Sequence, residues 1–130
     1  MGARRAAAAV LDAGALIAFD KGEARMRALV RQGLGDRVRF VVPAGVLAQA
    51  WRDGRRQARL AALVSDDHTT VEVLDELGAR VAGSLCGRAG VTDVIDASVV
   101  VAARLHDAPV VTTDPDDLRR LDPGVDVRAL

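Results

Sequence analysis

Aspartates stand directly after two apolar segments of the sequence. Asp12 interrupts the run AAAAVLDAGALIAF at residues 6–19, and Asp114 follows the apolar start of APVVTTDPDD. Burying a carboxylate among apolar residues is costly unless it is paired, so an acid at such a position is expected at an edge where its charge has a use. Each of the two acids could begin a helix or a turn, or together they could hold a cation.

A second pair of aspartates lies between them in the segment GVTDVIDASVVVAA. Asp93 and Asp96 are three residues apart, so they share one face near the start of the helix that this segment predicts. Apolar or small residues follow Asp96, and an inward carboxylate there needs a partner. Acids gathered in one place repel one another unless a cation neutralises them. Hard oxygen ligands without nearby His or Cys suit Mg²⁺ or Mn²⁺.

The elements that must position these acids alternate between strands and helices. Short β-branched runs predict strands at Ala7–Leu11, Val38–Val42, Thr70–Leu74, Val110–Thr113 and Val125–Arg128. Helical spacing predicts helices over Ala13–Phe19, Glu23–Leu34, Ala44–Val64, Asp75–Arg88, Asp93–Leu105 and Asp116–Leu121. Apolar strands separated by helices indicate a parallel sheet covered on both faces. Ligands of such sheets bind at the carboxyl ends of the strands, where Asp12 and Asp114 converge if their strands are neighbours.

Composition narrows the class of protein. A chain of 130 residues without a long Gly/Ser/Pro linker predicts one domain over residues 1–130. The 18 basic and 18 acidic residues cancel, and two Phe, one Trp and no Tyr give no aromatic platform for bases, so nucleic-acid contact must come from a local patch. No segment reaches the ~20 apolar residues of a membrane span. The single cysteine, Cys86, fits a reducing compartment, and we expect a cytoplasmic protein.

Each acid also has a purely structural interpretation. Asp12 and Asp93 could cap the helices that follow them, and Asp114 and Asp116 could be turn residues on either side of a proline. Asp96 is the hardest to explain in this way, because it lies about one turn inside a predicted helix.

Three segments in this order resemble a PIN domain, and most closely a VapC-type toxin ribonuclease: VLDAGALIAF, VPAGVLAQAWR and DVIDASVVVAARLHDAPVVTTDPDDL. The resemblance covers essentially the whole chain. It implies a three-layer α/β/α sandwich with a central, mainly parallel five-stranded sheet. It also implies a ribonuclease that depends on Mg²⁺ or Mn²⁺, that is inhibited by a cognate antitoxin, and that forms a homodimer.

The resemblance assigns roles to the acids one by one. Asp12, Asp96 and Asp114 match the family's first, third and fourth acids. The metal ligands that it implies are Asp12, Asp93, Asp96, Asp114 and Asp116, with Asp117 near enough to assist. The implied mechanism is hydrolysis of an RNA phosphodiester by a metal-activated water.

Two positions depart from the family's pattern. Gln49, in VPAGVLAQAWR, stands where the family commonly has its second acid, a glutamate. Glutamine can coordinate through its carbonyl oxygen or orient a water, so Gln49 stays in the expected catalytic set, but it cannot serve as a base. Its missing charge favours one bound ion over two. Gly14 stands where a small hydroxyl residue is frequent in the family.

A basic segment, WRDGRRQARL, is the expected contact for RNA. Arg52, Arg55, Arg56 and Arg59 have the spacing i, i+3, i+4, i+7, which predicts one stripe on the helix Ala44–Val64. Arginine suits bidentate phosphate contacts, so we expect the stripe to bind RNA. An ordinary solvated face and a docking surface for an acidic antitoxin segment are the alternatives.

Two other classes of protein fit part of the pattern. A non-catalytic PIN-like module would bind RNA or protein with a degenerate acidic site, and Gln49 would mark the lost activity. A receiver-like or phosphatase-like domain fits less well, because a receiver needs adjacent acids after its first strand and Asp12 has no acidic neighbour. A Mg²⁺ titration of the wild type and of Asp96→Ala separates an ion site from a set of helix caps.

Overall fold

Five parallel strands form the central sheet in the computed structural model, which describes residues 7–129. The strands are β1 (Ala8–Leu11), β2 (Arg39–Pro43), β3 (Thr69–Glu72), β4 (Val110–Thr112) and β5 (Val127–Ala129). They lie in the order β3-β2-β1-β4-β5, and every neighbouring pair is parallel. The strands β2 and β4 are almost wholly buried, as expected where both faces are covered. The predicted α/β class and mainly parallel five-stranded sheet are therefore confirmed.

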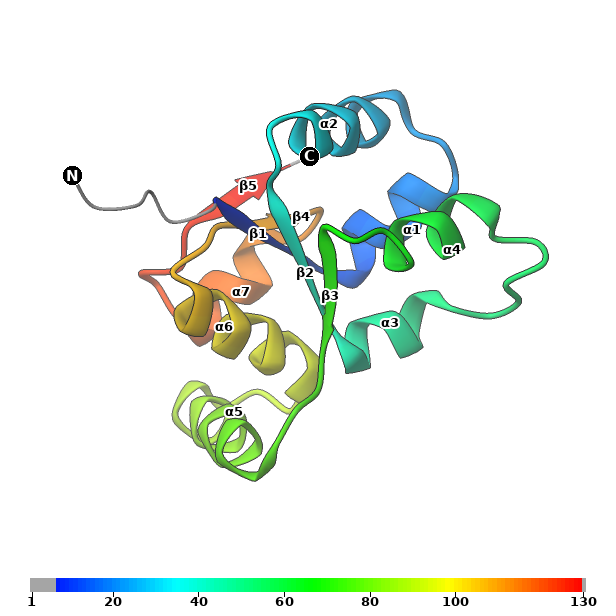
Figure 1. The fold of residues 1–130 in the computed structure, drawn as a ribbon. Helices are drawn as coiled ribbons and strands as arrows, with labels where there is room; N and C mark the ends of the chain where they lie inside the picture. The colour runs from blue at the N-terminus through cyan, green and yellow to red at the C-terminus, as the bar shows by residue number, and fades with distance from the viewer. Residues whose placement is uncertain (1–6, 130) are drawn as a thin grey trace.

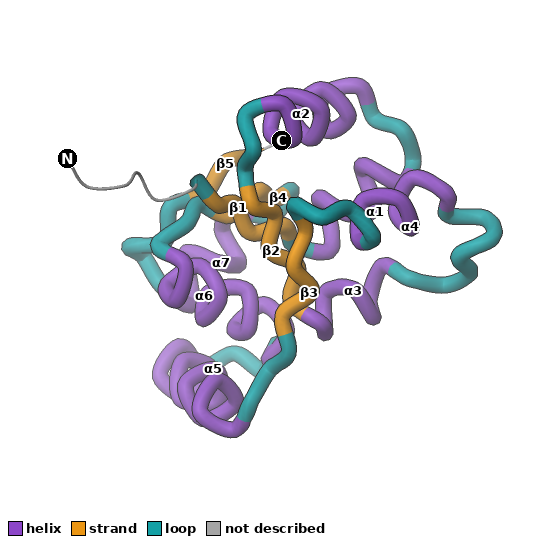
Figure 2. The backbone as a smooth tube through the Cα atoms, viewed as in Figure 1, coloured by secondary structure: helices purple, strands orange, loops and turns teal. Residues whose placement is uncertain are grey.

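Helices connect the strands and cover both faces of the sheet (Figures 1 and 2). Their bounds are α1 (Ala13–Asp20), α2 (Ala24–Gly35), α3 (Ala44–Ala50), α4 (Ala58–Val64), α5 (Glu76–Ala89), α6 (Val94–His106) and α7 (Pro115–Leu121). Figure 1 shows α1 to α4 on one side of the sheet and α5 to α7 on the other. Helix α6 packs directly on β1, β2 and β4, whereas α5 packs on α6 and α7. The layers are those of the predicted α/β/α sandwich.

The handedness of the connections explains which face each helix covers. The connections from β1 to β2 and from β2 to β3 move outward along the sheet in one direction. The connection from β3 returns past β2 and β1 to β4, and the next one continues to β5. Parallel crossovers are right-handed in nearly all proteins, so reversing the direction of travel places the later helices on the opposite face.

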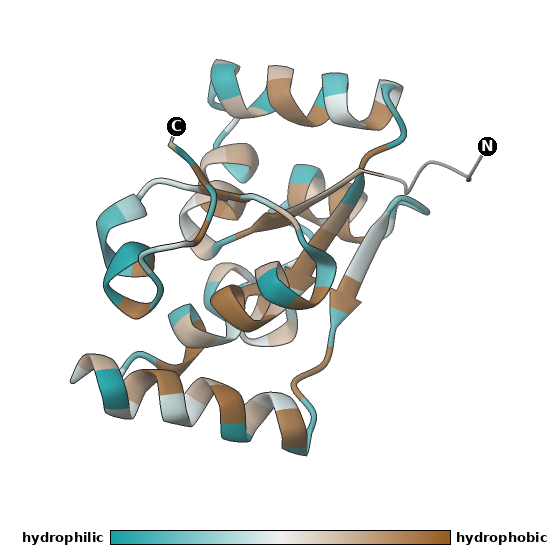
Figure 3. Cartoon of the chain, turned by 90° about the vertical axis from the view of Figure 1, so that its left-hand side faces the viewer, coloured by the Kyte–Doolittle hydropathy of each residue, from teal (hydrophilic) through white to brown (hydrophobic). Residues whose placement is uncertain are grey.

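The apolar core lies between the sheet and its two helical layers. Leu16 of α1 lies on one side and Val99 and Val100 of α6 on the other, and all three are fully buried. Figure 3 shows the apolar colour concentrated on the central strands, while α5, at the bottom of the view, alternates apolar and hydrophilic residues. This alternation is typical of a helix that packs through one face only.

The prediction of one helix over Ala44–Val64 is wrong, because the structure has two helices there, α3 and α4, with a loop between them. Trp51 has extended backbone angles and ends α3. The side-chain oxygen of Gln57 accepts the N–H groups of Arg52 and Asp53, and its amide nitrogen donates to the Ala50 carbonyl. One glutamine therefore satisfies backbone groups that a continuous helix would pair within itself, and this stabilises a loop over residues 51–57.

Because a loop separates α3 from α4, the predicted arginine stripe does not form on one helix. Arg52, Arg55 and Arg56 lie in the loop, and Arg59 lies on α4. The Arg52 guanidinium donates to the carbonyls of Ala48 and Trp51 at 3.0 and 2.7 Å, and thereby caps the end of α3. The four arginines therefore do not form one helical face, and their spacing in the sequence does not describe their arrangement.

Candidate active site

The acids gather at the point where the order of the strands reverses. The chain leaves β1 toward β2 on one side and leaves β4 toward β5 on the other, although β1 and β4 are neighbours. In open α/β sheets such a reversal opens a crevice at the carboxyl ends of the two strands. Asp12 directly follows β1, and Asp114 follows β4 by two residues. The two strands are neighbours, which is the condition under which Asp12 and Asp114 converge.

Asp12 is a helix cap and a member of the acidic group at once. It is 7% exposed, and its Oδ1 accepts the N–H of Ala15 at 2.9 Å as the N-cap of α1. Burial raises the pKa of Asp12, the Thr112 hydroxyl and the Ala15 N–H oppose that change, and the charge of Asp114 adds to it. The cap fixes the carboxylate beside a second acid, so the structural and the functional interpretations are compatible.

Asp93 and Asp96 begin α6. Asp93 is the N-cap, and its Oδ1 accepts the N–H groups of Ile95 and Asp96 at 3.1 and 2.9 Å. Asp96 is half-buried in the first turn, and burial raises its pKa to about 6, with further contributions from the charges of Asp93, Asp117 and Asp12. Three carboxylates from three parts of the chain therefore act on Asp96, which makes it the centre of the group.

Thr112 links the two strand ends and was not predicted as a site residue. It is fully buried at the end of β4, and its Oγ1 accepts the Asp114 N–H at 2.8 Å. The same side chain interacts with the carboxylate of Asp12. A hydroxyl can donate one hydrogen bond and accept others, so Thr112 can orient both acids. A buried threonine two residues before an aspartate is the local signal that could have indicated this role.

The acid on α7 that faces the group is Asp117, and the expected metal ligand Asp116 points away. The Asp116 side chain is 92% exposed and lies 3.5 Å from Arg119. Helix α7 buries Leu121. Asp117 is also exposed, but it precedes Leu121 by four residues and so lies on the same side of α7, where its charge acts on Asp96. The helical spacing in the sequence could have selected Asp117, because only one side of this short helix carries buried leucines.

A hollow of about 320 Å³ lies beside Asp96. Its lining includes the acids Asp93, Asp96 and Asp117, together with Arg120 from α7. Arg120 is an exposed cation, and sequence reasoning did not select it. An arginine at the rim of an acidic hollow can contact a phosphate while the acids hold a cation.

Gln49 lies on α3, whose start approaches α6. A side chain at Gly45 would meet Ile95, the neighbour of Asp96, at 3.3 Å. Gln49 is four residues after Gly45, so it lies on the same face of α3 one turn further on. Its side chain is exposed and carries no charge. The position lies on the face of α3 that approaches α6, and it adds no carboxylate to the acidic group.

The acidic group fits a hydrated divalent ion better than a fully protein-bound one. Within residues 7–129, no three or more His, Cys, Asp or Glu side chains are close enough to hold an ion together. Mg²⁺ usually retains several waters and takes only one or two carboxylates directly. Burial raises the pKa values of Asp12 and Asp96, and the charges of neighbouring acids add to this effect; a bound cation would favour the ionised forms. The carboxylate oxygens therefore suit a hard divalent cation.

A family model for the PIN domain matches residues 9–123. The chain belongs to the PIN domain family. PIN domains are generally nucleases, and they generally use divalent metal ions. The match includes all the acids described above, and the resemblance seen in the sequence is confirmed.

Solved structures with the same fold cover nearly all of this PIN domain. VapBC2 from Rickettsia felis, bound to a DNA fragment from its promoter, has a TM-score of 0.71 at 14% identity, over 95% of this chain and 98% of that one. FitAB bound to the IR36 DNA fragment has a TM-score of 0.64 at 15% identity, over 93% and 94%. FitAcB from Neisseria gonorrhoeae has a TM-score of 0.63 at 17% identity, over 92% and 95%. At these identities the likeness establishes the fold.

Two further results are negative. No curated protein sequence matches the chain significantly. Among residues 7–129, none of the helices is both long enough and apolar enough to traverse a bilayer.

Proposed function

We propose that this PIN domain is a ribonuclease that uses Mg²⁺ or Mn²⁺ and that it is the toxin of a toxin–antitoxin pair. One observation carries the proposal: carboxylates from β1, α6 and α7 converge on Asp96 where the strand order reverses. Burial, together with repulsion from the neighbouring acids, raises the pKa of Asp96 to about 6, and a cation would offset both effects.

The residues divide the work of phosphodiester hydrolysis between them. Asp12, Asp96 and Asp114 would surround the hydrated ion, with one or two of them bound to it directly and the others bound to its waters. When bound, the ion would supply a water of lowered pKa and offset the charge that develops on the phosphoryl oxygens. Arg120 would bind an RNA phosphate from the rim of the hollow. Gln49 would orient a water or the substrate through its amide, without accepting a proton.

The antitoxin partner is proposed from the structural relatives. The solved complexes carry the names VapBC2 and FitAB, and their chains are covered almost completely by this fold. Arg55 and Arg56, exposed in the loop between α3 and α4, would bind either an acidic antitoxin segment or the RNA backbone. An RNA-cleaving toxin acts where the cell's RNA lies, so the proposal places the chain in the cytoplasm.

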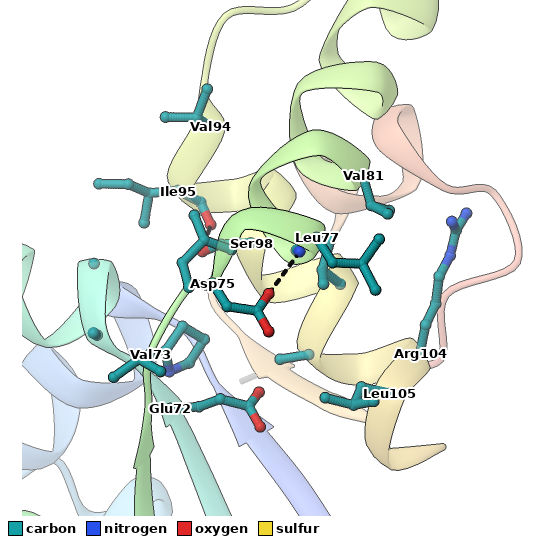
Figure 4. A pocket seen from close by; sticks show the side chains of 17 residues that line it. Glu72, Val73, Asp75, Leu77, Val81, Val94, Ile95, Ser98, Arg104 and Leu105 are labelled. Carbon is teal, nitrogen blue, oxygen red and sulfur yellow. Dashed lines mark hydrogen bonds between the residues drawn. The ribbon is translucent and has the colours of Figure 1, made fainter.

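We further propose a homodimer in which a second copy covers an apolar groove beside α6 (Figure 4). The groove has a volume of about 590 Å³ and lies between the end of β3, the start of α5 and α6. Exposed apolar side chains line it: Val73, Leu74, Leu77, Val94 and Leu105. Large exposed apolar patches mark interaction sites.

The charges around the groove favour a second copy over a nucleic acid. Glu72 lies 2.6 Å from His106, and Arg104 lies 3.0 Å from Asp122, so these rim charges are already paired. The chain has a formal net charge of zero, and two copies therefore meet without net repulsion. Light scattering of Leu77→Glu should show a monomer where the wild type and Ser84→Glu, on an exposed part of α5, remain dimers. A monomeric wild type would contradict this proposal.

The cleavage experiment uses matched aspartate substitutions. Asp12→Asn, Asp96→Asn and Asp114→Asn should each abolish Mg²⁺-dependent cleavage of RNA on a gel while the circular dichroism spectrum stays that of a folded protein. The control is Asp116→Asn, which removes an exposed carboxylate at the start of α7, two residues after Asp114. This variant should cleave RNA like the wild type. Wild-type rates in all three site variants would show that the acids do not form a metal site.

Gln49 keeps one alternative open, a non-catalytic PIN-like module that binds RNA or protein. Its neutral side chain replaces an acid that the resemblance leads one to expect. A wild type that binds RNA, shows no cleavage with Mg²⁺ or Mn²⁺, and gains none in Gln49→Glu would establish that alternative.

A further inference from the structure

Two adjacent threonines, Thr112 at the end of β4 and Thr113 just after it, have different surroundings. Thr112 is buried and its hydroxyl accepts the Asp114 N–H. Thr113, the next residue, is exposed, and its side chain lies against Gly14 in the first turn of α1. Thr113 lies in the bend that follows β4, since the strand ends at Thr112.

Thr113 fills the space that a side chain at position 14 would need. A Cβ built on Gly14 would overlap Thr113 Oγ1 and would lie 3.2 and 3.3 Å from its Cβ and Cγ2. The backbone does not require glycine there, because the glycines with positive φ among the described residues are Gly22 and Gly90. Glycine inside a helix lowers stability relative to alanine. The glycine at position 14 is explained by the room that it leaves for the Thr113 side chain.

The Thr113 hydroxyl lies against the first turn of α1, the helix that Asp12 caps. Asp12 accepts the N–H of Ala15 and is also bonded by the backbone of Gly14, the residue that Thr113 contacts. Asp114 directly follows Thr113 in the chain. The Thr113 hydroxyl therefore contacts a residue two positions after Asp12 and belongs to the residue directly before Asp114.

We propose that Thr113 is a positioning residue of the metal site: its hydroxyl hydrogen-bonds a water of the bound ion between Asp12 and Asp114, and Gly14 is required to admit it. The proposal rests on the proposed metal-dependent nuclease. A hydroxyl can accept from a metal-bound water and donate to a carboxylate, which a methyl group cannot do. Groups that orient ligands from outside the coordination shell commonly change metal affinity 10- to 100-fold when removed.

Calorimetric Mg²⁺ titration of two Thr113 variants tests the hydroxyl. Thr113→Val keeps the shape and removes the hydroxyl, so it should weaken Mg²⁺ binding about tenfold or more. Thr113→Ser keeps the hydroxyl and should bind Mg²⁺ within a few-fold of the wild type. Equal affinities of the wild type and Thr113→Val would overturn the proposal.

A transplant of the hydroxyl across the contact between Thr113 and Gly14 tests its position. In Gly14→Ser/Thr113→Gly the hydroxyl comes from α1 instead of β4, and Mg²⁺ affinity should recover toward that of the wild type. The matched control Gly14→Ala/Thr113→Gly has the same volume change without a hydroxyl and should stay weak. Equal affinities of the two double variants would contradict a role for the hydroxyl.

Thermal melts in EDTA test the geometry separately from any metal or activity. Gly14→Ala should lower the melting temperature, and adding Thr113→Gly should restore part of it, because the two positions share one space. Gly14→Ala with an unchanged melting temperature would overturn the contact. A wild type that binds Mg²⁺ but leaves RNA intact would refute the proposed function alone, since the titration still decides the role of Thr113. A wild type that binds no Mg²⁺ would overturn both.

Discussion

Asp96→Asn should make the metal-free protein more stable at neutral pH. Asp96 has a pKa of about 6 in the fold against an ordinary value of 3.8, because it is desolvated and faces the charges of Asp93, Asp117 and Asp12. The difference corresponds at pH 7 to a destabilisation of roughly 3 kcal/mol. Asp96 is only half-buried, so solvent screening reduces the expected gain in Asp96→Asn to about 1–2 kcal/mol. The melting temperature in EDTA should therefore rise by about 3–8 °C.

The pH dependence of this gain follows from the sign of the pKa change. A carboxyl with a raised pKa in the fold destabilises the protein above that pKa, and the effect disappears below the unfolded value. The gain in Asp96→Asn should thus be full at pH 7, shrink as the pH falls through about 6, and vanish near the ordinary pKa of 3.8. Melts in EDTA at several pH values measure it.

Mg²⁺ should reverse the order of the two proteins. A ligand at 100 times its Kd stabilises the protein that binds it by about 2.7 kcal/mol, and Asp96→Asn should lose most of that binding. The wild type should therefore be the more stable protein at saturating Mg²⁺ and the less stable one in EDTA. A variant that is less stable in EDTA at pH 7, or a gain that does not change with pH, would refute the reasoning.

Asp66→Asn is a control with the opposite sign. The His68 N–H donates to Asp66 at 2.8 Å and, with the His68 ring, lowers the pKa of Asp66. An acid with a lowered pKa stabilises the fold above its unfolded pKa, so Asp66→Asn should lower the melting temperature at pH 7. It should not change the response to Mg²⁺.

Three other expectations concern residues around the acids. Asp117→Asn removes a negative charge beside Asp96 and should therefore lower the pKa of Asp96. The acid limb of a pH profile of Mg²⁺-dependent cleavage should then move to lower pH. An unmoved profile would place Asp117 outside the group. Gln49→Glu should tighten Mg²⁺ binding in calorimetry and raise cleavage at limiting Mg²⁺, while lowering the apo melting temperature slightly; a protein identical to the wild type in both would place Gln49 outside the site. Arg55→Ala/Arg56→Ala should weaken RNA binding and flatten the slope of log affinity against log salt by about 1.4, because each lost contact with a single strand removes ~0.7; an unchanged slope would assign the loop to solvent or to a protein partner.

Local patterns in the sequence were sufficient to predict the strands and part of the site. Each apolar β-branched run became a strand within two residues of its predicted bounds at most ends, since burial on both faces leaves a signal in the strand itself. A helix-cap role was one interpretation of Asp12 and Asp93, and both accept backbone N–H groups of the next turn. Caps are contacts between residues two or three apart, so they can be predicted from neighbours in the chain.

The long helix shows where local patterns failed. Helical spacing continues through residues 51–57, but the Gln57 side chain pairs with the backbone of Arg52, Asp53 and Ala50 and stabilises a loop. Side-chain to backbone hydrogen bonds compete with helix formation, and periodicity does not register them. The prediction of an arginine stripe on one helix was wrong for this reason.

The sequence by itself determined which acids end strands and begin helices, because these features depend on residues a few positions apart. Only the tertiary structure decided which groups meet. Strand order places Asp12 beside β4, burial of Leu121 turns Asp117 toward Asp96 and leaves Asp116 in solvent, and the missing side chain of Gly14 admits Thr113. These contacts join residues far apart in the chain. They are set by how helices rotate to bury their apolar faces and by how strands are ordered, and both are properties of the whole packed core.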